Sequence, residues 1–244
     1  MRYEEVIKTL AAAFQRELPG SSAHAALAPR PRREWPAGFN PARIRNAAGL
    51  LLVFPAPGRS TTGLGPDRDR SRTRLGPEWD RSRTGVEPEL EAAHIVLTVR
   101  ADTLGRHGGQ ISLPGGVVDP GETFEQAAIR EAHEEIALAP DDVVPLGALT
   151  PLDIPVSGFR LHPIVATTRR RPSFRAADGE VAAILEIDLD ELANPSALVE
   201  QSRERDGVPM VVPGFHVRGV EIWGATGMVL AEFLTLLGWA RPNR

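Results

Sequence analysis

One helix constrains the fold of this chain more than any other segment, and it lies within residues 116–138, GVVDPGETFEQAAIREAHEEIAL. At about 100° of rotation per residue, three of its glutamates fall on one face. These are Glu131, Glu134 and Glu135. The opposite side carries a narrow apolar stripe that can pack on a sheet, formed by Ile129, Ala132 and Ile136. The pattern predicts a helix with a buried back and an acidic front.

The sequence also marks where this helix begins. Thr123 followed by Gln126 is a capping-box pattern, and Glu125 in the first turn suits the positive end of the helix dipole. Just before residue 116, Pro114-Gly115-Gly116 predicts a tight loop whose backbone can approach a ligand closely. The segment is therefore predicted to be a loop followed by a capped helix.

The acidic face is a candidate metal site. Three carboxylates at this spacing repel one another by a few tenths of a kcal/mol per pair, roughly, and a bound cation is the simplest compensation. Oxygen ligands without cysteine suit Mg²⁺ or Mn²⁺ better than Zn²⁺. Taken alone, however, an acidic helix face is more often a solvated surface than a metal site. The spacing of the glycines and charged residues over the whole segment 116–138 distinguishes a metal site from a solvated surface.

That spacing resembles the Nudix box, G-x5-E-x7-R-E-U-x-E-E-x-G-U, where U is aliphatic. The matching residues are Gly116, Glu122, Arg130, Glu131, Ala132, Glu134, Glu135 and Leu138. One position departs, because Ala137 stands where the family has its second glycine. In that fold the glycine follows the catalytic helix in a left-handed conformation, which costs alanine about 1 kcal/mol. The departure affects helix termination and leaves every charged position intact.

The resemblance implies a hydrolase of a nucleoside diphosphate linked to another group. It assigns Mg²⁺ binding, with Mn²⁺ as a possible substitute, to Glu131, Glu134 and Glu135, with a backbone carbonyl near Gly116. In the same assignment Arg130 orients Glu131, and Glu122 braces the loop through a salt bridge. Many members take one more glutamate from a later loop. Glu180 is the best candidate for that catalytic role, and an ordinary solvated glutamate is the alternative.

Residues 97–116, LTVRADTLGRHGGQISLPGG, resemble the signature that precedes the Nudix box in the coenzyme A pyrophosphatase subfamily. The positions that match are Thr98, Arg100, Ala101, Gly109 and Pro114-Gly115-Gly116. Gly105 replaces an arginine of the signature, and Leu113 replaces a phenylalanine. Coenzyme A carries a 3′-phosphate besides its pyrophosphate, and such groups favour forked cationic donors. The candidate substrate-binding residues are Arg100, Arg106, His107 and Gly115, with ordinary loop arginines as the alternative.

From these resemblances our hypothesis is Mg²⁺-dependent hydrolysis of coenzyme A or acyl-CoA to 3′,5′-ADP and a 4′-phosphopantetheine product. The two departures leave open a Nudix hydrolase of another dinucleotide, such as ADP-ribose or NADH. A third reading is a catalytically silent Nudix domain that binds a nucleotide. Silent domains commonly lose one of the glutamates, and none is missing here.

Composition narrows the remaining classes. The 244-residue chain has no cysteine, which excludes disulfides, thiolate catalysis and cysteine-bound zinc. Its formal net charge of −4 argues against nonspecific nucleic-acid binding. The sequence has no apolar stretch of membrane-spanning length, and its charged N-terminus does not resemble a signal peptide. We therefore expect a cytoplasmic enzyme with a small-molecule substrate and neither a nucleic-acid nor a membrane partner. A homodimer through the terminal helices is possible.

The expected fold is α/β (α+β), a Nudix-type α/β/α sandwich with a mixed central sheet and the catalytic loop-helix at 116–138. Residues 1–43 should form an N-terminal helix (4–18) and a connector, and 44–240 the Nudix domain. Strands are predicted at 47–55, 94–100, 143–150, 161–168, 180–189 and 215–223, where the last run is a strand pair. A helix and a variable loop are expected over 190–213, and a final helix over 224–237. An insertion at 57–90 contains an eleven-residue near-repeat at 64–85 and is expected to be a disordered hairpin.

Overall fold

The structure is a computed structural model, and it describes residues 1–58, 91–101, 109–205 and 207–242. The predictions for residues 59–90, which include the near-repeat, lie outside the described residues. So do Gly105, Arg106 and His107. Within the described ranges, no helix is both long enough and apolar enough to cross a bilayer.

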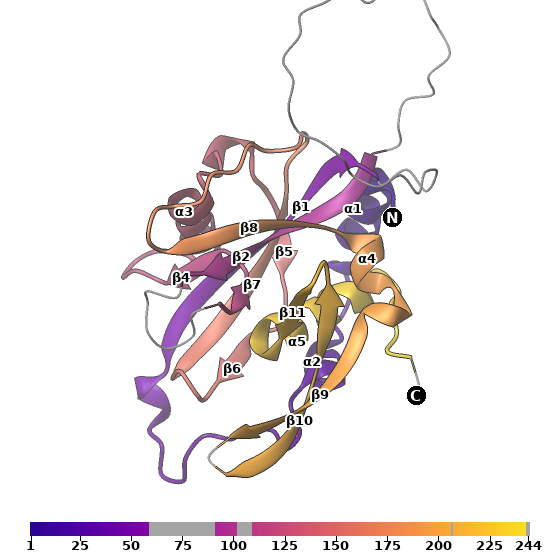
Figure 1. Cartoon of the computed structure of the whole chain (residues 1–244). Coiled ribbons are helices and arrows are strands. Elements are labelled where there is room, and N and C mark those ends of the chain that lie inside the picture. The colour runs from indigo at the N-terminus through magenta and orange to yellow at the C-terminus, as the bar shows by residue number, and fades with distance from the viewer. Residues whose placement is uncertain (59–90, 102–108, 206, 243–244) are drawn as a thin grey trace, which may run out of the picture.

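The centre of the fold is a mixed sheet of eight strands in the described part of the chain (Figure 1). Its main path runs β3 (Ile111–Ser112), β2 (Glu91–Arg100), β1 (Arg45–Pro57), β7 (Phe159–Thr167) and β5 (Val144–Ala148). Three strands lie off this path: β4 (Gly115–Val117) pairs with β1, β6 (Leu152–Ile154) with β7, and β8 (Val181–Asp188) with β2. β1 and β7 are parallel, whereas the other pairs are antiparallel. The predicted mixed sheet is confirmed.

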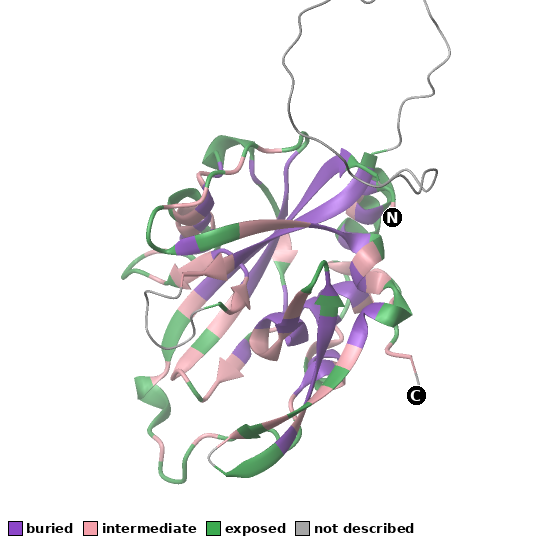
Figure 2. Ribbon diagram, in the orientation of Figure 1, coloured by how far each residue is buried: buried purple, intermediate pink, exposed green. Residues whose placement is uncertain are grey.

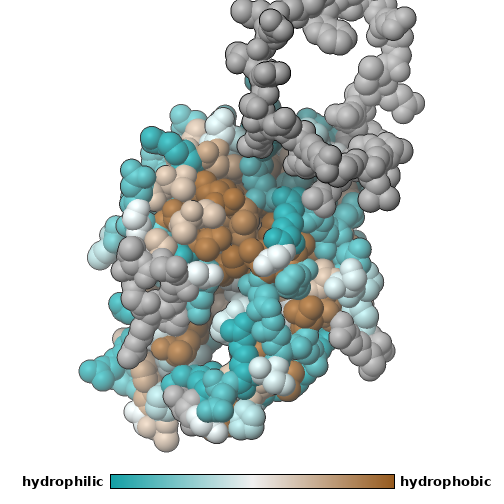
Figure 3. Space-filling view, in the orientation of Figure 1, coloured by the Kyte–Doolittle hydropathy of each residue, from teal (hydrophilic) through white to brown (hydrophobic). Residues whose placement is uncertain are grey.

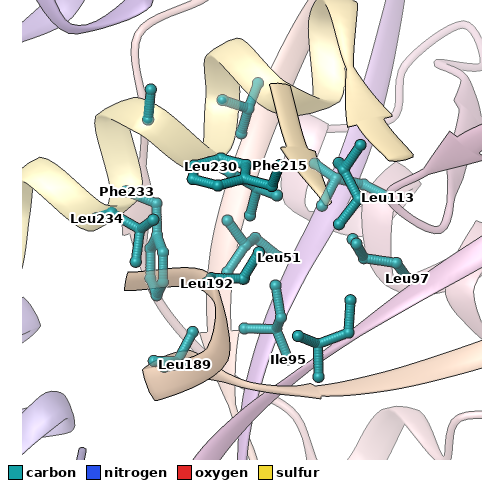
Figure 4. Packing of buried hydrophobic residues seen from close by; sticks show 14 of the residues in the cluster. Leu51, Ile95, Leu97, Leu113, Leu189, Leu192, Phe215, Leu230, Phe233 and Leu234 are labelled. Atoms are coloured by element: carbon teal, nitrogen blue, oxygen red, sulfur yellow. The ribbon is translucent and has the colours of Figure 1, made fainter. Parts of the chain in front are cut away.

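Helices cover both faces of this sheet because β1 is apolar on both sides. Leu50, Leu52 and Phe54 pack in the cluster that contains α3 (Phe124–Ile136). Leu51 and Val53 pack in the larger cluster, with side chains of α1 (Tyr3–Ala13), α2 (Gly20–Leu27) and α5 (Gly224–Leu236). Figures 2 and 4 show this core, with Leu51 near Leu230 of α5. The three layers confirm the expected α/β/α arrangement.

A second, three-stranded sheet replaces the variable loop that we expected over 190–213. The expected helix is present as the short α4 (Leu189–Ala193), which a 3₁₀ helix follows. The chain then forms β9 (Leu198–Arg205), β10 (Val208–Val217) and β11 (Val220–Trp223), in the order β11-β10-β9. The prediction was wrong because β9 has polar residues on both faces, LVEQSRER, and so lacks the apolar alternation of a half-buried strand.

Short 3₁₀ helices complete the described structure at Pro41–Arg43, Pro140–Asp142 and Pro195–Ala197. The first helix ends at Ala13, earlier than expected, because the chain turns so that Phe14 packs against Gly147 of β5. The presumed connector contains α2 and pairs through the backbone of Arg30 with Val211 of β10. The N-terminal segment is thus integrated into the core. The domain boundaries themselves stay a prediction.

A buried ion pair fastens α2 to α5. The Glu232 carboxylate is fully buried, and His24 Nε2 lies 2.8 Å from one of its oxygens. The Gly20 amide donates to it at 3.1 Å, and Thr150 donates from its amide at 3.1 Å and its hydroxyl at 2.7 Å. α5 is itself buried along residues 226–234, which leaves little of it for contact with a second copy. The oligomeric state stays a prediction.

Helix α3 begins and ends at the residues that its sequence predicts. Thr123 accepts from the Gln126 amide while the Gln126 side chain accepts from the Thr123 amide, which is a complete capping box. At the other end Ala137 adopts the left-handed conformation, with φ 55° and ψ 31°. The family glycine is therefore replaced by a residue that keeps the glycine conformation at an energetic cost.

Replacing Ala137 with glycine should stabilise the protein. The left-handed conformation strains an L-residue, and removing Cβ should raise the free energy of unfolding by roughly 0.5–1 kcal/mol after the entropic cost of glycine. Urea denaturation of the two proteins measures the difference. Ala139→Gly is the matched control, because Ala139 has a negative φ of −70° and should lose stability instead. Equal or lower stability of Ala137→Gly would contradict this account.

Candidate active site

The candidate site forms where β4 meets the acidic face of α3. β4 pairs with residues 47–49 of β1, which fixes Gly115 close to Ala48. The Gly115 amide donates a hydrogen bond of 3.1 Å to Glu135. A side chain at Gly115 would overlap the Ala48 carbonyl oxygen, so only glycine lets the loop lie this close to the sheet. Burial raises the pKa of Glu135 to about 7, more than the Gly115 amide lowers it.

Glu131 occupies the neighbouring position, against Gly116. Its carboxylate fills the space where a side chain on Gly116 would stand. Burial raises the pKa of Glu131, while the hydrogen bond from Arg130 acts in the opposite direction. The two glycines of β4 thus lie beside two different carboxylates of one helix face. The prediction of a tight loop at Pro114-Gly115-Gly116 was wrong, because Gly115 and Gly116 pair with β1 as part of a strand, and the close approach to a ligand stays a prediction.

Arg130 is bonded to most of the charged residues around the loop. Its Nε and Nη2 donate to the two oxygens of Glu122 at 2.9 and 3.0 Å, and Nη2 also donates to the Val117 carbonyl at 3.1 Å. Its Nη1 donates to Glu131 at 2.9 Å and to Glu134 at 3.3 Å. The hydrogen bond from Arg130 lowers the pKa of Glu122, which also accepts from the Asp119 amide at 3.1 Å. Glu122 thus joins the two ends of the loop.

The carboxylates do not yet converge on one point. Among the described residues, no group of three or more acidic or histidine side chains has the arrangement of a metal site. Arg130 accounts for this, since it holds both Glu131 and the more exposed Glu134. The donor set nevertheless suits a hard cation, because oxygen ligands from one helix face adjoin a glycine backbone. Glu131, Glu134, Glu135 and the Gly116 carbonyl are the groups that could hold Mg²⁺ or Mn²⁺.

Two more of the candidate residues lie near Glu135. Arg100 at the end of β2 lowers the pKa of Glu135 by its charge, and Glu180 before β8 raises it. The Ala101 amide donates to the Glu180 carbonyl at 2.9 Å, which joins these two segments. Charges from β2 and from the turn before β8 therefore act on a carboxylate of α3 that the β4 backbone also contacts.

Three other residues in or near the two motifs have structural roles. Thr98 is buried, with its hydroxyl 3.3 Å from the Ser112 carbonyl and 3.1 Å from the Ser112 hydroxyl. Leu113, which replaces a phenylalanine of the signature, belongs to the larger core cluster. His133 is exposed and bonds the Leu138 carbonyl at 2.9 Å, as a surface residue beyond the acidic face.

An aromatic stack at the start of α3 was not predicted from the sequence. The rings of Phe124 and His162 are 3.6 Å apart and 9° from parallel, and His162 Nε2 lies 3.1 Å from the Asn46 side-chain oxygen. Burial lowers the pKa of His162, and the charge of Arg160 acts in the same direction. These residues are far apart in the chain, and the only available signal was the aromatic residue directly after the cap.

Gly116→Ala should reduce hydrolysis without unfolding the protein. The added methyl group would meet the Glu131 carboxylate, which is the movable end of a side chain, so Glu131 should be displaced while the backbone stays. We expect a loss of activity of about 10–10³-fold, in the range seen when a group that positions the reaction is misplaced. Activity assays and thermal melting measure the two effects.

Gly115→Ala is the informative comparison, because there the methyl group would meet the backbone of β1. That variant should lose stability as well as activity. Full activity of Gly116→Ala would contradict the assigned position of Glu131.

Comparison with known proteins shows to which family the chain is similar. The family model described as the NUDIX domain matches residues 83–205, just over half of the chain. An uncharacterized Nudix hydrolase NudL of Enterobacter sp. (strain 638) is 34% identical over 149 residues, which cover 61% of this chain and 77% of that protein. The NudL of Yersinia enterocolitica is 36% identical over 137 residues, covering 56% and 70%. A solved Nudix hydrolase of M. smegmatis, RenU, is 24% identical with a TM-score of 0.42, covering 62% and 74%.

The NUDIX match covers the acidic loop-helix and most of the central sheet. The chain belongs to the Nudix family and is a Nudix pyrophosphohydrolase.

Proposed function

We propose that the protein hydrolyses the pyrophosphate of coenzyme A or acyl-CoA, with Mg²⁺ or Mn²⁺, to 3′,5′-ADP and a 4′-phosphopantetheine product. The observation that carries the proposal is the hydrogen bond between Gly115 and Glu135. Gly115 ends the segment that resembles the coenzyme A signature, and Glu135 belongs to the acidic helix. The two motifs thus meet at one place.

The residues divide the chemistry among them. Glu131, Glu134, Glu135 and the Gly116 carbonyl would hold the cation, which neutralises pyrophosphate oxygens and lowers the pKa of a bound water. Arg130 positions Glu131 and Glu134, and Glu122 holds Arg130. We assign acceptance of the water proton to Glu180, a carboxylate near enough to Glu135 to raise its pKa.

The substrate end of the site is supported by Arg100 and Gly115. The Arg100 guanidinium acts on the Glu135 carboxyl by its charge, so it lies close enough to meet a phosphate bound beside that residue. Gly115 offers a backbone surface without a side chain. Arg106 and His107 are further phosphate-binding candidates, and they lie outside the described residues.

A second candidate substrate is another nucleoside diphosphate derivative, such as ADP-ribose or NADH. The observation that favours it is the place of Leu113. A phenylalanine of the coenzyme A signature is absent there, and the leucine is used in the core.

Parallel assays of four substrates test the proposal. Purified protein is incubated with coenzyme A, ADP-ribose, NADH and nucleoside triphosphates in the presence of Mg²⁺, with Glu135→Gln as the inactive control. We expect coenzyme A to be the best of the four substrates and 3′,5′-ADP to appear as a product. Good turnover of another substrate without turnover of coenzyme A would overturn the substrate assignment.

A further inference from the structure

The second sheet holds an aromatic and cationic cluster that the proposed chemistry does not use. The Arg203 guanidinium lies over the Trp223 ring, 4.3 Å from its centroid. Arg203 is fixed there by Glu221 at 2.9 Å and by the Gln201 side-chain oxygen at 2.9 and 3.2 Å. All four side chains are partly exposed. The indole therefore has one supported face and remains partly open to solvent.

Three of these residues, Gln201, Glu221 and Trp223, line a small crevice on the second sheet. Trp223 pairs with Gly214 in β10, where a side chain would crowd the Trp223 Cβ and the Ile222 carbonyl. Gln201, Gly214, Glu221 and Trp223 line the crevice together with Val199, Val212 and Phe215.

The cluster is connected to the candidate active site through β3. Trp223 ends β11 and directly precedes α5, and the Thr226 hydroxyl donates to the Ile111 carbonyl of β3 at 2.9 Å. Gly115 follows Ile111 by four residues, which span at most about 13 Å of extended chain. β11 lies against β3, and Figure 3 shows a mainly hydrophilic, hollowed surface around the β9–β10 hairpin.

We propose that Trp223 is a stacking platform for the purine base of the nucleotide substrate, with Arg203 holding the indole in place. This inference rests on the proposed function, since it extends the site that cleaves the pyrophosphate. A planar base gains most from a rigid indole, because stacking needs no particular hydrogen-bond pattern. Arg203 is already paired with Glu221 and is thus a positioning residue and not a phosphate ligand.

The test compares two replacements of Trp223 in the full-length protein. Trp223→Leu fills much of the space but cannot stack, whereas Trp223→Phe keeps an aromatic face. With coenzyme A and Mg²⁺, Trp223→Leu should raise KM by about 5-fold to 100-fold, the usual range for loss of one base stack, and change kcat by less than about 3-fold. Trp223→Phe should recover most of the lost affinity. Trp35→Leu is the matched control, because Trp35 is also partly exposed and stacked, on Phe39.

A binding measurement separates this inference from the proposed function. AMP and ribose 5-phosphate differ only in the base, and calorimetry with each ligand isolates the contribution of stacking. Wild type should prefer AMP, and Trp223→Leu should lose that preference. If coenzyme A is not hydrolysed but the preference depends on Trp223, the platform stands and the substrate assignment fails.

If Trp223→Leu leaves both KM and the preference for AMP unchanged, the platform is overturned, and Trp223 only packs the sheet. A drop in melting temperature without either effect leads to the same conclusion. Should Trp223→Leu fail to fold, Arg203→Met decides by the same preference, because it removes the group that holds the indole. Arg203→Met should weaken the preference for AMP, whereas Trp223→Phe should largely keep it. An unchanged ratio in Arg203→Met would overturn the platform held by Arg203.

Discussion

Glu135→Gln should lower kcat by about 10²–10⁴-fold, the range expected when a charged group acting on proton transfer or metal binding is lost. Glu135 is the member of the acidic face that the loop backbone contacts, through the Gly115 amide. A glutamine can still accept that hydrogen bond through its amide oxygen. The fold should therefore persist while the negative charge disappears.

The measurement is kcat at saturating Mg²⁺, on whichever of the four assayed substrates is turned over best. Glu125→Gln is the control, because Glu125 lies on the same helix but is exposed in its first turn. It should retain nearly full activity. If Glu135→Gln kept more than about a tenth of the wild-type kcat, Glu135 would be outside the chemistry.

The second large effect concerns stability. Glu232→Ala should lower the free energy of unfolding by about 3–5 kcal/mol, since it removes one partner of a buried ion pair and strands the other. His24 would lose its only charged partner among the described residues, and Thr150 and Gly20 would lose the acceptor of their hydrogen bonds. Urea unfolding measures the change. Glu5→Ala is the control, because the Glu5 side chain is exposed on the surface of α1. This replacement should alter stability by less than about 0.5 kcal/mol.

Acid should weaken the same network. Burial raises the pKa of Glu232, but the hydrogen bonds from His24 and Thr150 and the charge of His24 outweigh it, so the net pKa is below its ordinary value. The folded protein then binds fewer protons than the unfolded chain in mildly acidic solution. The stabilisation is complete above the unfolded pKa of about 4.3 and is lost as the pH falls through the folded pKa. The stability gap between wild type and Glu232→Gln should therefore narrow with acidification. A gap independent of pH would contradict this assignment.

The sequence predicted the loop-helix closely because its signals are local. Thr123 and Gln126 are three residues apart, and Ala137 directly follows the helix that it ends. Each of these inferences depends on residues within about two helical turns of one another.

Features that depend on distant residues could not be predicted. Glu232 and His24 are 208 positions apart, and neither lies in a motif. The hydrogen bonds from Arg130 to Glu131 and Glu134 depend on side-chain rotamers, which the spacing of these residues in the sequence does not reveal. Strand β9 was missed because it has no apolar face to mark it, whereas the strand pair expected at 215–223 corresponds to the end of β10 and to β11. Proximity of Arg100, Glu180 and Glu135 required the whole sheet.

The register of β1 and β2 bears on how the enzyme can be altered. Pro57 and Glu91 are the last paired residues of the two strands, so the chain leaves the sheet and returns to it at adjacent points. The entropy of closing such a connection grows only slowly with its length. We therefore expect that the segment between these residues can be lengthened, shortened or exchanged without moving Gly115 or the glutamates of α3. This junction is a natural place to splice in a tag or a reporter domain.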